Sequence, residues 1–446
     1  MSTKKLWQKD IASTGAVENF TVGADRELDM QLARADVLGS LSHTRMLQSI
    51  GLLSAQELQQ VQQGLKEIYG EIVRGSFTIE DGVEDIHSQV ELMLTDRLGE
   101  VGGKIHSGRS RNDQVLLDLR VYLRREIYDI VGLCHTLFQR LQSLANEHKD
   151  TLLPGYTHLQ IAMPSSFGLW FGAYAESLVD DVQMLEAAYR IINKNPLGSA
   201  AGYGNSFPLN RTMTTSLLGF DTLSYNVVYA QMGRGKSERV LAQAMGSVAS
   251  TLAKLAMDNA LYLSQNFGFI SYPPELTTGS SIMPHKKNPD VWEIMRGRCN
   301  VIAGVSNQIT LLTTNLPSGY HRDLQLLKEV LFPAITSLKE CLVMADYMLS
   351  HVSVKKDILE AQMYDYIFSV DVVNEMVLSG IPFREAYRTI GRQIEKGEYT
   401  PKRGVKHTHE GSIGNLCLDK VDKLMEENLA KFNFEKFLDA EKSLVQ

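Results

Sequence analysis

The chain of 446 residues has little cysteine, with only Cys134, Cys299, Cys341 and Cys417. No two of them are close in the sequence, so there is neither a Cys-x-x-Cys pair nor a disulfide framework. Long apolar runs are also missing, since no stretch reaches the roughly 18 apolar residues that a membrane span needs. Residues 1–10 are too polar for a signal peptide. These absences predict a cytoplasmic protein with no membrane partner.

Positive charge is in deficit as well. The chain has 45 lysines and arginines against 52 aspartates and glutamates, a formal net charge of −7. A protein that coats nucleic acid usually carries a basic excess, so a nucleic-acid-binding scaffold is disfavoured and no nucleic-acid partner is expected. A small anionic substrate is still compatible with this charge, because one local cationic pocket would be enough to bind it.

The common metal and nucleotide motifs are absent too. There is no His-Glu-x-x-His and no phosphate-binding Gly-x-x-x-x-Gly-Lys-Ser/Thr. The run Gly233-Arg234-Gly235 follows no strand pattern and is interpreted as a turn. We therefore expect no metal and no cofactor.

Proline is sparse, with 12 residues, and none lies in 1–153, 209–272 or 334–381. Because proline breaks helix interiors, these gaps permit long helices, and apolar residues within them recur at steps of three and four. Ser165 and Asn288, each next to a proline, are candidate helix N-caps. The helices expected from these patterns cover 111–148, 165–192, 236–264 and 290–312.

Four long helices in the middle of the chain favour a bundle, and strand patterns are scarce. We predict an all-α fold of three helical domains. An N-terminal domain covers 1–108, a central long-helix bundle covers 109–357, and a small C-terminal domain covers 358–446.

The segment from Thr277 to Asp290 is the first candidate for chemistry. It combines a Gly-Ser-Ser tip, the cations His285, Lys286 and Lys287, and the start of a helix. A helix N-terminus offers free N–H donors and a partial positive charge, so this loop could hold a carboxylate or phosphate. A surface loop with solvated lysines is the competing interpretation.

Two further polar turns lie at expected helix ends. Residues 106–114 place two arginines at the start of a long helix, and arginine matches carboxylates in two-point contacts. Residues 155–160 carry His158 just before Pro164. For the first turn the competing interpretation is an ordinary capped helix start whose arginines face water. For the second it is a structural histidine, which is the more common role of a lone histidine in a loop. In a bundle such turns can converge at one end, within one chain or between neighbouring subunits.

At these residues the sequence resembles the fumarase/aspartase superfamily, and within it most closely the argininosuccinate lyases. Residues 279–289, Gly-Ser-Ser-Ile-Met-Pro-His-Lys-Lys-Asn-Pro, resemble the superfamily signature, and residues 106–114 and 155–160 resemble two other family regions. Residues 84–87 and 320–328 also have counterparts. The resemblance spans about residues 20–440.

This resemblance implies a twenty-helix core in a homotetramer, with each active site drawn from three subunits. It implies a carbon–nitrogen lyase of arginine biosynthesis that splits argininosuccinate into arginine and fumarate without a cofactor. By the same resemblance Ser280 is the base and His158 the acid, Lys286 stabilises the carboxylate charge that builds up, and Glu293 pairs with His158. The substrate-binding residues it implies are His87, Arg109, Ser110, Arg111, Asn112, Thr157, Asn288, Tyr320, Gln325 and Lys328.

Two departures from the family pattern leave alternatives open. Residues 20–28 differ from the usual serine-bearing loop, so no residue is assigned there. His285 stands where argininosuccinate lyases often have glutamine and adenylosuccinate lyases have histidine, so an adenylosuccinate lyase-type or related fumarate-releasing enzyme is one alternative. A non-catalytic, crystallin-like structural protein is the other.

Overall fold

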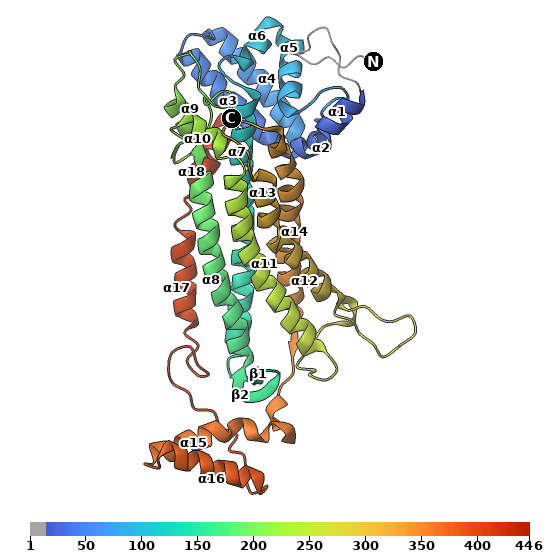
Figure 1. Cartoon of the computed structure of the whole chain (residues 1–446), viewed down its shortest axis with the longest axis vertical. Helices are drawn as coiled ribbons and strands as arrows, with labels where there is room; N and C mark the ends of the chain where they lie inside the picture. The colour runs from blue at the N-terminus through green and yellow to red at the C-terminus, as the bar shows by residue number, and fades with distance from the viewer. Residues whose placement is uncertain (1–14) are drawn as a thin grey trace.

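The computed structural model describes residues 15–446, and the polar N-terminal residues 1–10 lie outside this range. Long helices run side by side along the molecule and form its central bundle (Figure 1). The bundle consists of α7 (Arg111–Glu147), α8 (Phe167–Ile192), α11 (Lys236–Leu263), α12 (Asp290–Ala303), α13 (Val305–Thr313) and α14 (Leu327–Leu349). Their apolar faces bury one continuous core.

The sequence predicted three of these helices closely, but the expected helix 290–312 is wrong as a single element. It is divided at Gly304, whose N–H bonds the Val301 carbonyl at 3.0 Å. Glycine favours helix least of all residues except proline, which explains the break. Within α14, Pro333 lacks the N–H for the usual helical bond, yet the helix continues through it.

Two predicted caps are also corrected. Ser166, not Ser165, caps α8, because the preceding residues form strand β2, and its Oγ accepts from the Leu169 N–H at 3.1 Å. Pro289, not Asn288, is the N-cap residue of α12.

The start of α11 depends on a glycine. Gly235 has φ +79°, and a Cβ at this position would come within 2.5 Å of the Thr313 side chain. The chain therefore turns tightly at Gly233–Gly235, as predicted, before α11 begins. By length and composition α11 could cross a membrane, but half of its most apolar window is buried inside the fold, where it packs against α8 and α12.

The N-terminal helices cover one end of the bundle (Figure 1). They are α1 (Gly15–Val22), α2 (Asp25–Asp29), α3 (Ala33–Ser49), α4 (Ala55–Val73), α5 (Ile86–Leu98) and α6 (Glu100–Gly103), with α9 (Arg211–Leu217) and α10 (Val227–Met232) near the same end.

Helices α15 (Ser369–Leu378) and α16 (Phe383–Glu395) lie beyond the opposite end of the bundle. Helix α17 (Leu418–Leu429) then returns along α8, and α18 (Phe434–Val445) reaches α3. The domain boundaries at residues 108 and 357 stay a prediction.

Strands are few and short in the described residues, which confirms the all-α class. They form three two-stranded sheets: β1 (Leu152–Thr157) with β2 (Gln160–Ser166) antiparallel, β3 (Lys194–Asn195) with β4 (Thr222–Leu223) parallel, and β5 (Ile270–Ser271) with β6 (Ser353–Val354) antiparallel. The β1–β2 hairpin matters most, because it carries His158 at the end of the bundle away from the N-terminal helices (Figure 1).

Candidate active site

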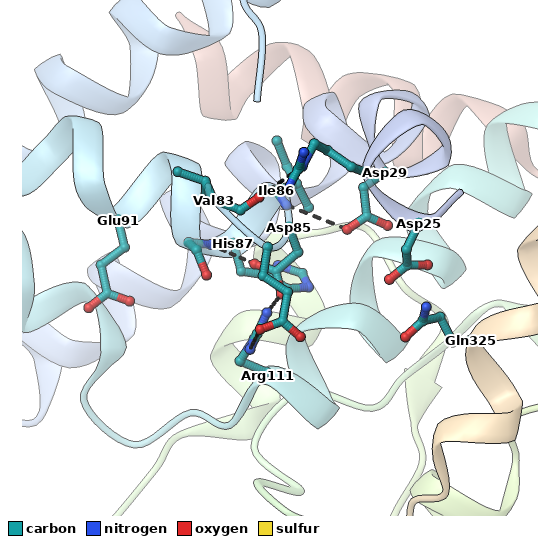
Figure 2. Close-up of polar contacts among 12 residues, drawn as sticks. Asp25, Asp29, Val83, Asp85, Ile86, His87, Glu91, Arg111 and Gln325 are labelled. Carbon is teal, nitrogen blue, oxygen red and sulfur yellow. Dashed lines mark hydrogen bonds and ion pairs between the residues drawn. The ribbon is translucent and has the colours of Figure 1, made fainter. Parts of the chain in front are cut away.

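A pocket of about 160 Å³ lies where the N-terminal helices meet the bundle. Six residues that the family resemblance assigned to substrate line it, although they come from distant parts of the chain. These are His87, Arg111, Asn112, Tyr320, Gln325 and Lys328. Figure 2 shows Asp25, Asp29 and Gln325 on one side of this region, beside Asp85, His87 and Arg111.

The start of α5 fixes Arg111 at the pocket wall. Asp85 is the N-cap of α5, and its Oδ1 accepts from the Ser88 N–H at 2.9 Å. Arg111 pairs with Asp85 and, through Nη1, with Glu84 Oε2 at 3.4 Å. The N-terminus of α7 is thereby tied to that of α5.

Lys328 is 3% exposed and lies between two carboxylates. Its Nζ is 2.5 Å from Oδ1 of both Asp25 and Asp29. Burial raises the pKa of Asp25, and the Lys328 charge partly offsets this rise. Gln325 Nε2 donates to the carbonyls of Thr21 and Val22 at 3.0 and 3.1 Å.

The segment 20–28 that departs from the family pattern therefore forms part of the pocket. Asp25 and Asp29 were not predicted as site residues, although four-residue spacing places both on one face of a helix. Arg234 was also missed, because its Gly-Arg-Gly run indicated only a turn. Its Nη2 donates to the Leu324 carbonyl at 3.0 Å, and its guanidinium lies 5.7 Å from the Tyr320 ring centroid.

Charge in the pocket is closely balanced. Four carboxylates from α2 and from the start of α5 face four permanent cations from α7, α14 and the adjoining turns. The carboxylates are Asp25, Asp29, Glu84 and Asp85, and the cations are Arg111, Arg234, Arg322 and Lys328. Arg322 was not predicted as a site residue either. Its Nη2 lies 3.0 Å from Glu84 Oε1.

His87 is the one imidazole in the pocket lining, and it is buried. Its Nδ1 lies 2.7 Å from Asp36 Oδ1 and 3.4 Å from Asp118 Oδ2. Burial alone would lower the pKa of His87, but the hydrogen bond to Asp36 and the charges of Asp36, Asp118 and Asp29 outweigh burial and raise the pKa to about 9. His87 is therefore an imidazolium at neutral pH.

Ser110 and Arg109 have local partners of their own. Ser110 caps α7, and its Oγ accepts from the Asn112 N–H at 3.3 Å. Asp113 completes the capping box and also accepts from the N–H groups of Gly198 and Ala200. Arg109 is buried outside the pocket lining, where its Nη1 donates to Ser40 Oγ at 3.0 Å.

The β1–β2 hairpin presents His158 to solvent. His158 and Leu159 form its two-residue turn, and both have left-handed backbones, with φ of +53° and +58°. Such turns usually use Asn-Gly, and a leucine in this conformation is strained. Thr157 and His158 are exposed, and Leu159 is 76% exposed.

The signature loop between α11 and α12 projects sideways from the bundle (Figure 1). A backbone bridge between Thr278 and Asn288 closes it, and the Asn288 amide donates to the Gly279 carbonyl at 3.3 Å. At its tip Ser280 Oγ accepts from the N–H groups of Ile282 and Met283, at 3.4 and 3.2 Å.

One chain does not bring all the predicted residues together. Lys286 is exposed on the signature loop, and Glu293 is exposed on α12. Helix α7 begins at Arg111 in the pocket, and its 37 residues are about 55 Å long. Thr157 and His158 lie beyond its other end. The pocket, the hairpin and the signature loop are thus three separate parts of one molecule.

Known structures show the same fold at low sequence identity. An EDDS lyase variant with bound fumarate matches with a TM-score of 0.73 and 22% identity, covering 95% of this chain and 91% of that one. A class II fumarase from Schistosoma mansoni matches with a TM-score of 0.72 and 16% identity, covering 95% and 97%. At these identities the likeness concerns the fold alone.

Sequence relatives are much closer. Residues 10–304 match the lyase family. The argininosuccinate lyase of Parabacteroides distasonis is 59% identical over 442 residues, covering 99% of both chains, and that of Bacteroides thetaiotaomicron is 58% identical with the same coverage. The argininosuccinate lyase of Stenotrophomonas maltophilia is 37% identical, covering 93% of this chain and 97% of the relative. The chain therefore belongs to the lyase family and, within it, to the argininosuccinate lyases.

Proposed function

We propose that this chain splits argininosuccinate into arginine and fumarate by β-elimination, at active sites that several copies of the chain build together. A base removes the proton from the carbon next to a carboxylate, and the electron pair left behind forms the carbon–carbon double bond of fumarate. The bond to the guanidine nitrogen breaks, and that nitrogen takes a proton from an acid as arginine leaves. The observation that carries the proposal is the pocket that gathers six family-assigned residues.

Ser280 is the base. A serine hydroxyl is a poor base unless its alkoxide is stabilised, and the two N–H groups that already point at Ser280 Oγ supply such stabilisation. The charge of Lys286 in the same loop favours the alkoxide and the charge that develops on the substrate carboxylate. Asn288, held at the base of the loop, adds a polar contact to the substrate.

His158 is the acid that protonates the leaving nitrogen. An imidazole can give up a proton and regain it within one turnover, which suits this role. Its exposure at a hairpin tip leaves the imidazole free to enter a neighbouring subunit's site. Glu293, exposed on the first turn of α12, pairs with the imidazole there.

The pocket binds the substrate. Arg111 and Asn112, with Ser110 and Thr157, hold its carboxylates, because a planar guanidinium matches a carboxylate in two-point contacts. Tyr320, Gln325 and Lys328 contact the remainder, and His87 adds a charged donor. Arg109 supports this wall from behind through Ser40.

We infer a homotetramer, because the three regions lie apart in one chain and further copies of the chain would bring them together. Neighbouring bundles that run antiparallel would place the hairpin of one chain beside the pocket of another. Helices α12, α13 and α14 carry large apolar side chains on their outer faces, which a partner chain would bury. These include Ile294, Val301, Leu311 and Val343, which are 61%, 67%, 66% and 52% exposed.

We infer a cytoplasmic location as well. All four cysteines are free thiols, and three of them are buried. Unpaired cysteines are ordinary in reducing compartments, where disulfides are rare.

The test is release of fumarate from argininosuccinate by the purified chain, followed by ultraviolet absorbance. Adenylosuccinate is the matched control substrate, and we expect little or no release from it. Release from adenylosuccinate alone would move the assignment to that enzyme type. Release from neither would favour a structural protein.

A further inference from the structure

Behind His87 lies a buried pair of carboxylates for which the proposed reaction has no direct use. Asp36 on α3 and Asp118 on α7 are 2% and 1% exposed. Neither lines the pocket, yet both approach Nδ1 of His87 on α5. Three helices that are distant in sequence therefore meet at one nitrogen atom.

These two carboxylates have few other partners. One oxygen of each, Oδ2 of Asp36 and Oδ2 of Asp118, is buried without a hydrogen bond within residues 15–446. A buried carboxylate normally satisfies both oxygens, because an unpaired one is costly. The cost is reduced here by the imidazolium of His87 and by the charge of Arg109, which faces the same two aspartates.

The contact is a hydrogen bond. The distance of 2.7 Å between Nδ1 of His87 and Oδ1 of Asp36 is normal for an N–H···O hydrogen bond, with Nδ1 as the donor. Since Nδ1 is engaged with Asp36 and His87 also lines the pocket, the opposite nitrogen, Nε2, is the one available to a ligand there. Together the aspartates fix both the orientation and the charge of the ring.

We propose that Asp36 and Asp118 are positioning residues, which hold His87 as an imidazolium so that its Nε2–H donates to a carboxylate of the ligand in the pocket. They act through His87 and do not contact the ligand themselves. The assignment of that ligand as argininosuccinate rests on the proposed function, whereas the arrangement around His87 does not.

The charges around His87 favour the protonated ring overall. Carboxylates approach it from three helices, and cations lie across the pocket and behind it. The carboxylates are Asp29, Asp36 and Asp118, and the cations are Arg109, Arg111 and Lys328. With a pKa of about 9, His87 stays charged up to mildly alkaline pH and loses its proton above that. Binding that depends on the charged ring should therefore weaken as the pH rises past about 9.

Asp36→Asn tests this directly, because it removes the charge and keeps the size. In the variant, His87 should lose its proton at a lower pH than in the unaltered chain. The kcat/KM of the variant, divided by that of the unaltered chain, should therefore fall as the pH rises, roughly tenfold between pH 6 and pH 8.5. KM should carry most of this change and kcat little. Burial and the neighbouring Asp36 raise the pKa of Asp118 well above its ordinary value, so Asp118→Asn removes less charge and should have a smaller effect in the same direction. His87→Gln, whose donor does not titrate, should remove this pH dependence.

Asp181→Asn is the matched control. Asp181 is also buried and accepts from Ser247 and Thr251 at 2.5 and 2.7 Å, but it lies between α8 and α11 away from the pocket. The Asp181→Asn variant should leave the shape of the pH profile unchanged. An equal loss at every pH in Asp36→Asn and Asp118→Asn would overturn the positioning role.

Calorimetric titration with fumarate separates this inference from the proposed function. A chain that releases no fumarate from argininosuccinate refutes the function, while weaker alkaline binding of fumarate in Asp36→Asn still supports the role of the aspartates. Fumarate affinity with the same pH dependence in both chains would refute that role even if the enzyme is active.

Discussion

Lys328 Nζ lies 2.5 Å from Asp29 Oδ1, although 299 positions separate the two residues in sequence. The ion pair joins α14 of the bundle to the short helix α2. Both side chains are at least 97% shielded from solvent, so each depends on the other for compensation of its buried charge. This contact and the hydrogen bonds from Gln325 to the Thr21 and Val22 carbonyls help to hold α2 and the residues before it against the bundle.

Lys328→Met should therefore destabilise the protein by about 3–5 kcal/mol, because it leaves Asp25 and Asp29 buried without their cation. Urea unfolding measures the loss. Adding Asp29→Asn to that variant should recover part of it. Lys402→Met is the control, since Lys402 pairs with Glu375 on the surface and its loss should cost about 1 kcal/mol or less. Equal effects of the two lysine substitutions would contradict a buried, compensated pair.

Ser280→Ala should reduce turnover by roughly 10²–10⁴-fold, the range expected when a general base is lost. Fumarate release gives the rate, and light scattering checks that the assembly is intact. Thr277→Ala removes a hydroxyl from the same segment, where Thr277 Oγ1 only donates to the Pro274 carbonyl at 3.1 Å. That control should stay within a few-fold of the unaltered chain. Full activity of Ser280→Ala would exclude Ser280 as the base.

Co-expression of Ser280→Ala chains with His158→Asn chains tests whether the active site is shared. Each variant alone should be inactive, and both substitutions fall on exposed or half-buried loop positions that tolerate them. If the serine and the imidazole come from different chains, random mixing in equal amounts leaves about a quarter of the sites with both groups intact. About a quarter of full activity should return. A mixture as inactive as its parents would mean that both groups come from the same chain.

Helices α7, α8 and α11 were predictable from sequence because helical periodicity and the absence of proline act locally. Helix α14 was not predicted, because Pro333 lies inside it. The break at Gly304 was harder to predict, since apolar spacing continues on both sides of it. The N-cap of α8 is Ser166 and not Ser165, because the residues before the helix pair as a short strand. No helix pattern in the sequence reveals that pairing.

The pocket was predictable only where the family resemblance supplied residues. His87, Arg111 and Lys328 were assigned in this way, but Asp25 and Asp29 were not, because their role depends on Lys328 from the far half of the chain. Tertiary ion pairs of this kind leave no periodic signal. Nor could sequence reveal that Arg109 is turned toward Ser40 while Arg111, two residues on, faces the pocket.

Asp113 gives the stability of the protein a specific pH dependence. Burial raises the pKa of Asp113 to about 6 from an ordinary 3.8, against the opposing effect of backbone N–H groups and Arg109. The folded state thus holds this proton more tightly than the unfolded state. The resulting stabilisation is fully present below pH 3.8 and is lost as the pH rises through 6, a change of roughly 3 kcal/mol.

Asp113→Asn isolates this contribution, because asparagine stays neutral while its carbonyl oxygen can still accept from Gly198 and Ala200. Urea unfolding from pH 4 to pH 7 should show the unaltered chain losing about 3 kcal/mol relative to the variant. Parallel stability curves for the two chains would mean that Asp113 titrates normally and that burial does not control its charge.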